Sequence, residues 1–524
     1  MAFKLTYATM YNPPDELHAN YDVSLTKLKG NLGQEYGMFI NGEEVKADEQ
    51  FEDRTPINTD VVLAVMQKGD EKHAQMALSA ARKAFPAWSH TPWQERIKIL
   101  RKAADLIDER LTDLGAAMSM EVGKNRMEAL GDVAETADLI RYSCDQVEAN
   151  GGYVKMMGKD PLPNHDATNI SVLRPYGVWL VVSPFNFPFA LTGGPAGAAL
   201  AAGNTIVIKP ATDTPFIVRL LANCFRDAEI PDGVVNFVTG PGRTIGAALV
   251  DSPEVNGVTF TGSYDVGMKM YRDFANGKWI RPIVLELGGK NPAIVSRNAN
   301  LDDAAAGIVR SAFGLQGQKC SAASRVFIEA PVYDELVGKL KESTEKLAIG
   351  DPTDRKVFLG PVINKNSYQD FQNFCGELGN VGKFLTGGKI LTEGSFAKGF
   401  YCSPTFVTDV PLENRLWKYE MFLPITTIAK VKNLDEAMKH ANDVDYGLTA
   451  GFYGSDDEAQ WFFDKIEAGV TYANRPQGAT TGAWPGFQPF GGWKGSGSSG
   501  KNAGGYYYVP LYLHEQIRTL IRPK

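Results

Sequence analysis

Three residues in the sequence have the side chains that attack on a carbonyl group and hydrolysis of the adduct require. Cys320 lies in GLQGQKCSAASR, where glycines and small residues permit close backbone approach, Lys319 could favour a thiolate, and the thiol could act as a nucleophile. Glu286 ends an apolar strand before two glycines, so its carboxylate could act as a base at a sheet edge. Asn186, between Pro184 and Pro188 in VVSPFNFPF, could donate its amide to an oxyanion.

Each of these residues also has an ordinary structural interpretation. A lone cysteine is more often a small buried hydrophobe. A glutamate at a strand end can be solvated or salt-bridged, and an asparagine between prolines can simply shape a turn. The three residues therefore form a hypothesis that depends on the elements around them.

The pattern of apolar residues predicts two α/β domains. Residues 70–150 carry apolar side chains at helical spacing, and from residue 177 short apolar strands alternate with helices, which is typical of a parallel, doubly wound sheet. A second series begins at residue 291, so we place the boundary near the Gly288-Gly289 pair. GVWLVVS and PIVLELGG are representative strands of the first series.

Two further segments resemble strands that join neither series. They are 151–177, containing YVKMM and NISVLRP, and the terminal YYYVPLYLHEQIRTLI, and we expect them to form an arm that pairs with another subunit. GGWKGSGSSGKNAGG has the composition of a flexible linker. The predicted divisions are 1–150 (N-terminal arm and helices), 151–176 (arm strands), 177–287 (cofactor-binding domain), 288–478 (nucleophile domain) and 479–524 (substrate loop and C-terminal strand).

Composition excludes several functional classes. The formal net charge of −7 offers no basic surface for nucleic acid, and no apolar run approaches the roughly 20 residues that cross a bilayer. The N-terminal residues lack a signal or transit pattern, so we expect a cytoplasmic protein. Five scattered cysteines predict reduced thiols, and six histidines without a metal-binding motif give no support for a metal site.

Taken together, SPFNFP, VIKPATDTP, FTGS, LELGGKNP, GQKCSAASR, YEMFLPI and QPFGGWKGSG resemble the aldehyde dehydrogenase superfamily in that family's order. The resemblance implies that Cys320 is the nucleophile, that its backbone N–H and Asn186 form an oxyanion hole, and that Glu286 activates the hydrolytic water. It also implies oxidation of an aldehyde to an acid by NAD or NADP. The residues that it assigns to the cofactor are Lys209, Thr212, Gly240, Gly262, Ser263, Glu420 and Phe422.

The cofactor motifs differ in strength. VTGPGRTIG, with Gly240, resembles the dinucleotide fingerprint GxGxxG without matching it, and such glycine-rich turns need not meet a phosphate. The family resemblance instead favours Gly262 and Ser263, at a helix N-terminus, for the pyrophosphate. Thr212 stands where NAD-specific relatives often carry a glutamate. This predicts NAD with measurable NADP use, although Asp213 could restore selectivity for NAD.

Within the superfamily, the chain most resembles Δ1-pyrroline-5-carboxylate dehydrogenases, which oxidise L-glutamate γ-semialdehyde to glutamate. That resemblance assigns the substrate's α-carboxylate to Ser321, Gly482 and Ala483. It also places Lys319, Phe185 and Phe490 at the substrate. The alternative is that Lys319 is a solvated lysine and that the two phenylalanines belong to the hydrophobic core. Trp484 stands where a smaller aliphatic residue is usual, and the surrounding loop is about three residues longer, which could reshape the pocket.

Three alternatives remain open at this point. The enzyme could act on another carboxylated or aromatic semialdehyde, or it could transfer the acyl group to CoA, although Glu286 favours hydrolysis. The chain could also be a silent scaffold, which the presence of Cys320, Glu286, Asn186 and Glu420 argues against. A homodimer is the minimum assembly that we expect.

Overall fold

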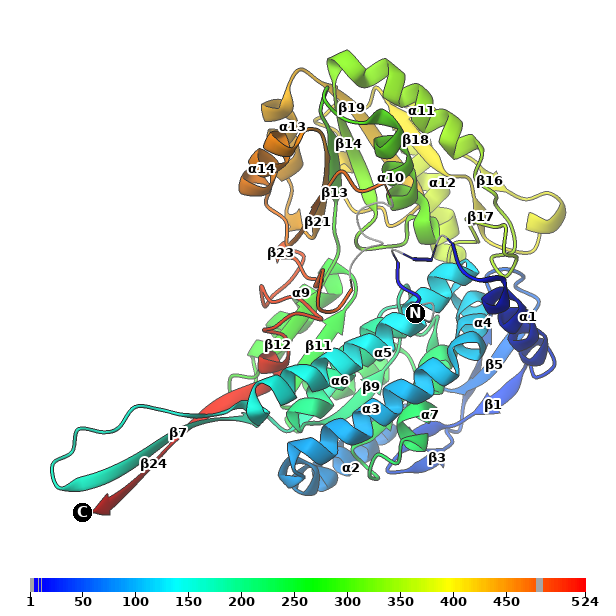
Figure 1. Ribbon diagram of the computed structural model, residues 1–524. Coiled ribbons are helices and arrows are strands. Elements are labelled where there is room, and N and C mark those ends of the chain that lie inside the picture. Colours follow the sequence, from blue (N-terminus) through cyan, green and yellow to red (C-terminus); the bar gives the residue numbers. More distant parts are fainter. Residues whose placement is uncertain (1–3, 8, 11, 477–483) are drawn as a thin grey trace.

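The computed structural model describes residues 4–7, 9–10, 12–476 and 484–524. Two α/β lobes are stacked one above the other, and a long two-stranded arm projects from the lower lobe (Figure 1). The predicted fold class, two α/β domains with a strand arm, is confirmed. None of the helices in these described ranges is long and apolar enough to cross a membrane.

The lower lobe contains a seven-stranded sheet in the order β12-β11-β8-β9-β10-β2-β3. Its central strands are parallel and almost wholly buried, as expected for a sheet covered on both faces. The strands are β2 (Met38–Ile40), β3 (Glu43–Val45), β8 (Val178–Val182), β9 (Thr205–Lys209), β10 (Val235–Phe237), β11 (Gly257–Thr261) and β12 (Ile283–Glu286).

Helices pack on both faces of this sheet, and the longest of them, α5, crosses the front of the lobe (Figure 1). The helices of the lobe are α1 (Asp15–Lys29), α2 (Glu71–His90), α3 (Trp93–Glu109), α4 (Leu111–Val122), α5 (Arg126–Ala149), α6 (Ala190–Ala202), α7 (Pro215–Asp227), α8 (Ala247–Asp251) and α9 (Tyr264–Ala275). Alanine and glycine predominate in α6, all but one of whose residues are buried, because it is packed closely against α5.

The structure differs from the sequence prediction near the N-terminus, where we expected a polar arm. The strands β2 and β3 extend the large sheet, while β1 (Gln34–Tyr36), β5 (Val62–Gln67) and β4 (Gln50–Arg54) form a separate sheet. These strands have three to six residues, and β4 is QFEDR with a largely exposed pattern. β1, β3 and β4 are short and largely polar, and β2 and β5 are apolar but only three and six residues long, so none of them shows a hydrophobic period over enough residues to be predicted.

The upper lobe has its own seven-stranded sheet, in the order β15-β18-β19-β14-β13-β21-β22. The strands are β13 (Asn291–Val295), β14 (Ala323–Glu329), β15 (Lys383–Phe384), β18 (Thr405–Thr408), β19 (Ile425–Val431), β21 (Thr449–Tyr453) and β22 (Val470–Ala473). Its helices are α10 (Leu301–Phe313), α11 (Tyr333–Glu345), α12 (Lys365–Gly379), α13 (Leu434–Asn442) and α14 (Asp456–Lys465). Two small two-stranded antiparallel sheets pair β16 (Ile390–Leu391) with β17 (Tyr401–Cys402) and β20 (Tyr446–Gly447) with β23 (Trp493–Lys494).

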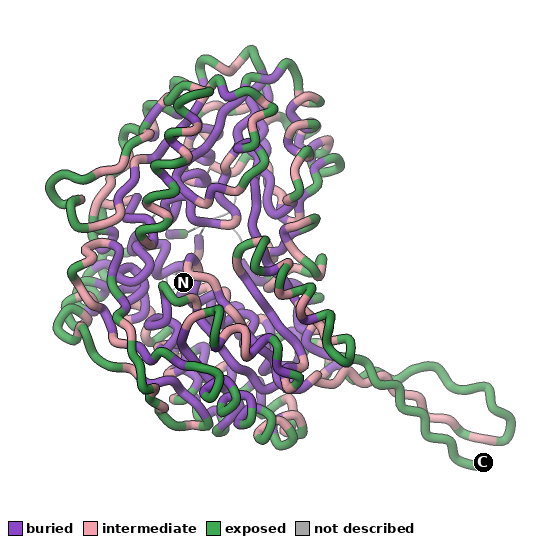
Figure 2. Tube along the Cα trace, turned by 180° about the vertical axis from the view of Figure 1, so that it is seen from behind, coloured by how far each residue is buried: buried purple, intermediate pink, exposed green. Residues whose placement is uncertain are grey.

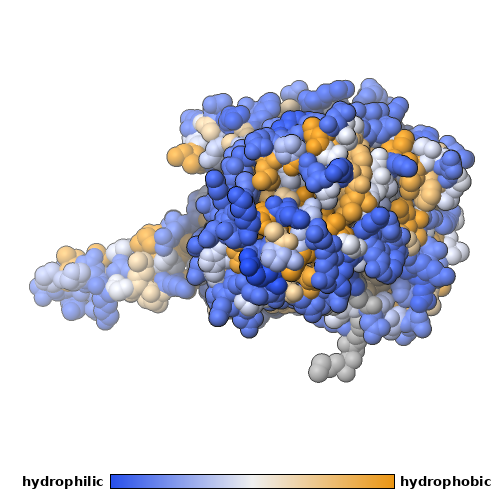
Figure 3. Space-filling model, turned by 90° about the horizontal axis from the view of Figure 1, so that it is seen from above, coloured by the Kyte–Doolittle hydropathy of each residue, from blue (hydrophilic) through white to orange (hydrophobic). Residues whose placement is uncertain are grey.

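The arm consists of β6 (Val154–Met156), β7 (His165–Pro175) and β24 (Leu513–Pro523). All eleven residues of β24 pair with β7 in antiparallel register. The arm is exposed or half-buried along its length (Figure 2), and Figure 3 shows apolar residues on a segment that stands clear of the body. Its exposed apolar side chains are Val154, Met156, Met157, Leu162, Ile517, Leu520 and Ile521.

The glycine-rich segment 491–505, predicted to be a flexible linker, is packed between the lobes. Ser496 is fully buried, and its hydroxyl donates to the carbonyl of Gly288 at 2.7 Å. The Leu287 N–H donates to the Ser496 carbonyl at 2.8 Å, and Gly497 forms an isolated bridge with Glu286. Close backbone approach requires glycine at Gly491, Gly492 and Gly497, and positive φ values of 60° and 72° favour glycine at Gly500 and Gly504.

Candidate active site

The carboxyl end of the lower sheet faces the amino end of the upper sheet, and most of the predicted residues lie there. Glu286 is the last residue of β12, opposite Thr261 at the end of β11, and Lys209 is the last residue of β9. Side chains at this edge of a parallel sheet face the crevice where α/β proteins bind ligands.

Cys320 lies in a tight loop between α10 and β14. The loop begins with a turn, Gly314–Gly317, in which Leu315 and Gln316 have φ of 46° and 56°. At Gly317 a Cβ would lie 2.3 Å from the carbonyl oxygen of Leu423, so only glycine fits. This conformation costs energy in an ordinary loop and is characteristic of a functional one.

Two asparagine amides hold the nucleophile loop. The Asn186 Nδ2 donates to the carbonyl of Gln318 at 3.0 Å, which brings the predicted oxyanion donor against the loop of Cys320. The Asn291 Nδ2 donates to the carbonyls of Cys320 at 2.8 Å and of Ala322 at 2.9 Å. Asn291 was not predicted, although its place in LELGGKNP could have drawn attention to it.

Cys320 is the only half-buried cysteine of the five, and the other four are buried. Desolvation by the surrounding protein is the main cause that raises the pKa of Cys320 to about 12, and the nearby carboxyl groups of Glu420 and Glu286 contribute to that rise. Lys319 acts in the predicted direction and lowers this pKa, but its effect is smaller than theirs, and its ammonium is buried in an ion pair with Glu128. Because Lys319 does not outweigh the effect of burial, the thiol needs a base.

Two buried carboxyl groups flank the thiol. Burial raises the pKa of Glu286 to about 7, and a hydrogen bond with Tyr508 opposes this shift. The Oε1 atom of Glu286 is buried without a partner among the described residues. Burial likewise raises the pKa of Glu420 to about 7, against a hydrogen bond from the Gly289 N–H at 2.8 Å.

A cavity opens beside the thiol, between α5, α6 and the C-terminal region. Cys320 and Ser321 form one wall, and Phe187, Trp484 and Phe490 form apolar walls. Gly482 and Ala483 lie outside the described residues. The Trp484 indole N–H donates to Asp138 at 2.7 Å, so the tryptophan fixes the wall of this cavity.

The far end of the cavity holds a pair that the sequence analysis did not identify. The Tyr7 hydroxyl donates to the carboxylate of Glu135 at 2.7 Å, and both residues line the cavity. Burial raises the pKa of Glu135 to about 8. Tyr7 fits because residue 131 is glycine, where a Cβ would lie 2.7 Å from the tyrosine ring. No local signal in the sequence joins residues 7 and 135.

Of the phenylalanines predicted at the substrate, Phe490 lines the cavity and Phe185 does not. Phe185 packs edge-on against Phe422, with ring centroids 5.8 Å apart. Phe187, two residues later, takes the place expected for Phe185, and the Lys124 ammonium lies 3.5 Å from the centre of its ring. Phe422 itself has φ of 57°, which turns the chain after Glu420.

Of the residues predicted at the cofactor, Lys209, Gly262 and Ser263 lie at the carboxyl end of the lower sheet, whereas Glu420 and Phe422 precede β19 of the upper sheet. Lys209 is buried, its ammonium donates to the Pro210 carbonyl at 2.8 Å, and burial lowers its pKa to about 8. Gly262 and Ser263 immediately precede α9, whose first N–H groups point out of the helix. Thr212 is exposed, while the Gly240 backbone is packed against Gly69, leaving no room for a Cβ.

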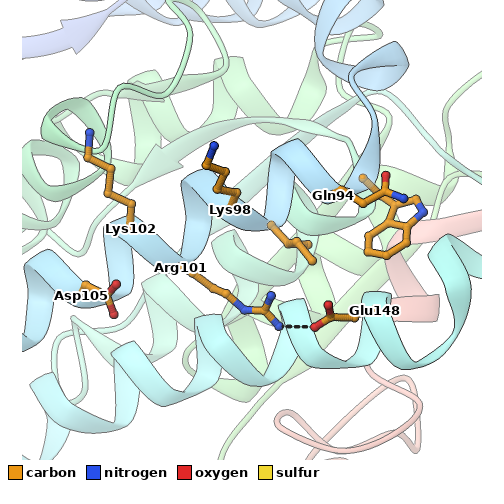
Figure 4. Close-up of a pocket in the computed structure, with 8 residues that line it drawn as sticks. Gln94, Lys98, Arg101, Lys102, Asp105 and Glu148 are labelled. Atoms are coloured by element: carbon orange, nitrogen blue, oxygen red, sulfur yellow. Dashed lines mark hydrogen bonds and ion pairs between the residues drawn. The ribbon is translucent and has the colours of Figure 1, made fainter.

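A second hollow lies on the outer face of α3, away from this crevice (Figure 4). Most of its charges are paired: Arg101 binds Asp145 and Glu148, Lys102 binds Glu229, and Asp105 binds Arg141. It contains no nucleophile, so we do not regard it as the catalytic site.

Comparison with known proteins agrees with the geometry. Residues 44–517 match the model of the aldehyde dehydrogenase family. The chain belongs to the aldehyde dehydrogenase family. It is 37% identical, over 95% of both chains, to a 1-pyrroline-5-carboxylate dehydrogenase of Geobacillus sp. (strain WCH70), and 36% identical to that of Bacillus subtilis (strain 168) over 95% of this chain and 94% of that one.

Solved structures of other aldehyde dehydrogenases share the whole fold. The 1-pyrroline-5-carboxylate dehydrogenase from Thermus with bound NAD covers 98% of each chain with a TM-score of 0.91 and 34% identity. A 3,6-anhydro-L-galactose dehydrogenase in complex with NAP covers 93% of this chain and 100% of its own, with a TM-score of 0.85 and 33% identity. Relatives that are named for different substrates therefore share this aldehyde dehydrogenase fold.

Proposed function

We propose that the protein oxidises an aldehyde to a carboxylic acid, with Cys320 as nucleophile. The observation that carries the proposal is the position of Cys320, half-buried where the crevice and the cavity meet, with Asn186 against its loop and Glu286 nearby. Because the pKa of Glu286 is raised to about 7, this group can accept a proton near neutral pH. A thiol with a raised pKa requires such an acceptor.

In the first half of the reaction, the thiolate adds to the aldehyde carbon and a thiohemiacetal forms on Cys320. The Asn186 amide carries two N–H donors, one of which bonds Gln318, and with the Cys320 backbone N–H it would hold the developing oxyanion. Loss of hydride from the adduct leaves a thioester. Glu286 then removes a proton from water, which attacks the thioester and releases the acid.

We infer that NAD accepts the hydride, and that NADP is also used. The residues present fit a dinucleotide: a buried lysine, Lys209, that donates to the neighbouring carbonyl, a helix N-terminus at Ser263, and a carboxylate at Glu420 held by the Gly289 N–H. Lys209 and Glu420 would bind the two riboses, and the amides of Gly262 and Ser263 the pyrophosphate. Thr212 places no carboxylate against a 2′-phosphate, so complete inactivity with millimolar NADP would contradict this inference.

We propose L-glutamate γ-semialdehyde as the substrate, as the names of the relatives suggest. Ser321 would donate to its α-carboxylate, and Gly482 and Ala483, outside the described residues, would complete that contact. The apolar walls of the cavity suit the aliphatic portion of the substrate. Glu135 suits the ammonium group of the substrate, because a cation there would offset the free-energy cost of ionising this carboxyl group, whose pKa is raised by burial. Another semialdehyde remains the second candidate, since Trp484 narrows the pocket.

The decisive experiment is an absorbance assay of the purified protein for reduced nicotinamide with each cofactor. Glutamate semialdehyde, propanal, hexanal and an ω-carboxylated aldehyde without an amino group form the panel. We expect glutamate semialdehyde to have the highest kcat/KM. A preference for hexanal would reject the substrate and keep aldehyde oxidation, whereas no turnover of any aldehyde would reject both. Added CoA should yield no acyl-CoA.

We further propose that the arm pairs with another copy of the chain, giving at least a homodimer in the cytoplasm. The seven exposed apolar side chains of the arm and its open strand edges support this proposal. Sedimentation at micromolar concentration should show no stable monomer.

A further inference from the structure

A row of four buried polar side chains runs from the core of the lower lobe to Glu286. The Trp179 indole N–H donates to the Thr259 hydroxyl at 3.0 Å, and Thr259 and Tyr512 lie 3.1 Å apart, oxygen to oxygen. The Tyr512 hydroxyl donates to that of Tyr508 at 2.9 Å. The Tyr508 hydroxyl in turn faces the Glu286 carboxyl group and lowers its pKa by hydrogen bonding, against the effect of burial. None of these four side chains exceeds 2% exposure.

The two ends of the row fix the direction of every hydrogen bond in it. An indole N–H can only donate, and an ionised carboxylate can only accept. Tyr508 has one hydrogen, which goes to Glu286, so Tyr508 accepts from Tyr512. Tyr512 has then used its own hydrogen and accepts from Thr259. All four hydrogens therefore point toward Glu286, and such aligned bonds strengthen one another.

We propose that this row, defined by Trp179, Thr259, Tyr512 and Tyr508, holds Glu286 in place and stabilises its carboxylate, so that the base is ionised when the thioester is hydrolysed. Tyr508 is thus a positioning residue for the general base. The inference rests on the proposed function of Glu286. The segment that contains both tyrosines was predicted only as a strand of the arm.

The two carboxylate oxygens of Glu286 have different surroundings. One hydrogen from Tyr508 can satisfy only part of a buried carboxylate, and Oε1 has no partner among the described residues. That free oxygen is the one available to a water molecule. The charged and titratable groups that act on Glu286 or on the thiol beside it are Tyr508, Tyr512, Cys320, Glu420 and, from the nucleophile loop, Lys319.

The test measures reduced nicotinamide formed from NAD and glutamate semialdehyde, with propanal as second substrate, across pH 5.5 to 9.5. In wild type at the low-pH end, protonated Glu286 should slow hydrolysis, so that a burst near one equivalent per site precedes a slow steady rate. In Tyr508→Phe, the acidic limb of the steady rate should move upward by about one pH unit. The burst should persist, and raising the pH should restore turnover.

Two variants of Thr259 keep the test independent of Tyr508 itself. Thr259→Val retains the shape but removes the hydroxyl, so it should shift the acidic limb in the same direction by a smaller amount. Thr259→Ser retains the hydroxyl and should match wild type. Tyr453→Phe removes a buried tyrosine hydroxyl that donates to the Arg475 carbonyl in the other lobe, and it should leave the limb unchanged.

An unshifted limb in Tyr508→Phe would overturn the proposal, as would equal losses of burst and steady rate at every pH. If Thr259→Val behaved like wild type, the proposal that Thr259 acts on Glu286 through the two tyrosines would be overturned. If wild type itself formed no reduced nicotinamide from either aldehyde, the proposed function would fail, and this inference with it.

Discussion

Two carboxyl groups with tyrosine partners lie on opposite sides of the site, Glu286 with Tyr508 and Glu135 with Tyr7. Both have pKa values raised by burial, to about 7 and about 8, and in both the tyrosine bond favours the charged form. They differ in what supports the tyrosine. Tyr508 accepts from Tyr512 within a row of donors, whereas Tyr7 comes from an N-terminal segment and receives no hydrogen bond from a second tyrosine among the described residues.

This difference assigns the two pairs to different tasks. A rigid strand end supported by aligned donors suits a base that must be ionised in every catalytic cycle. A carboxyl group at the cavity's far end, covered by a terminal segment, suits recognition of a substrate that supplies its own positive charge. The following predictions test that division.

The largest effect concerns the thiol between the pairs. Cys320→Ala should reduce aldehyde oxidation by several orders of magnitude, because no thiohemiacetal can form. Cofactor binding, followed by fluorescence titration, should survive. Cys144→Ala, which truncates a fully buried cysteine of α5, is the control and should cost stability with little loss of kcat. Undiminished turnover of the Cys320 variant would reject the mechanism.

The next effect separates the base from the rest of the site. Glu286→Gln should lower the steady rate by about 10² to 10⁴-fold while leaving the burst, because the amide cannot accept a proton. In wild type the steady rate should fall below pH 7, since the pKa of Glu286 is raised to about 7 and only its ionised form accepts a proton.

Glu329→Gln is the matched control for Glu286. Glu329 also ends a parallel strand, β14, but it is paired with Arg297 at 2.7 Å and should not affect hydrolysis. A burst that disappears in Glu286→Gln would contradict the assignment of Glu286 to the hydrolytic step.

These two glutamates show how far the sequence could predict the site. Both end apolar strands, and one is catalytic by our proposal while the other is the salt-bridged strand end that we considered as an alternative. Only the resemblance, through LELGGKNP, distinguished them. The two α/β series were predictable because buried strands and amphipathic helices have distinct periods, which the short strands β1 to β5 lack.

Glu135, Tyr7 and Tyr508 were not predicted because their roles depend on contacts between distant segments. Tyr7 and Glu135 are 128 residues apart in sequence, and the whole nucleophile domain lies between Glu286 and Tyr508 in the sequence. Neither tyrosine belongs to a motif. Folding brings them to the site, and local pattern carries no information about such pairs.

A smaller effect is expected at the wall of the cavity that Cys320 and Ser321 form. Ser321→Ala should lower kcat/KM for glutamate semialdehyde by about ten- to a hundredfold, because a hydrogen bond to a charged group is worth roughly 1.5 to 3 kcal/mol. Propanal should be little affected. Ser324→Ala, three residues later at the start of β14, is the control, since the hydroxyl of Ser324 has no partner among the described residues. Because Ser321 also hydrogen-bonds the thiol of Cys320, equal losses on both aldehydes would assign it to the nucleophile instead.

The smallest expected effect tests the pair of Tyr7 and Glu135, to which we assign substrate recognition. Tyr7→Phe removes the donor to Glu135 and so raises the cost of ionising that carboxyl group. Glu135 is only partly buried, so water can replace part of the lost bond, and we expect about a three- to tenfold rise in KM for glutamate semialdehyde. The value of kcat should not change, because Tyr7 does not contact the reacting atoms. An ω-carboxylated aldehyde without the amino group is the matched control substrate, and its KM should stay the same. If both substrates lose affinity equally, Tyr7 supports the cavity wall through its edge-on contact with Trp484, 5.4 Å between ring centroids, and Glu135 does not recognise an ammonium group.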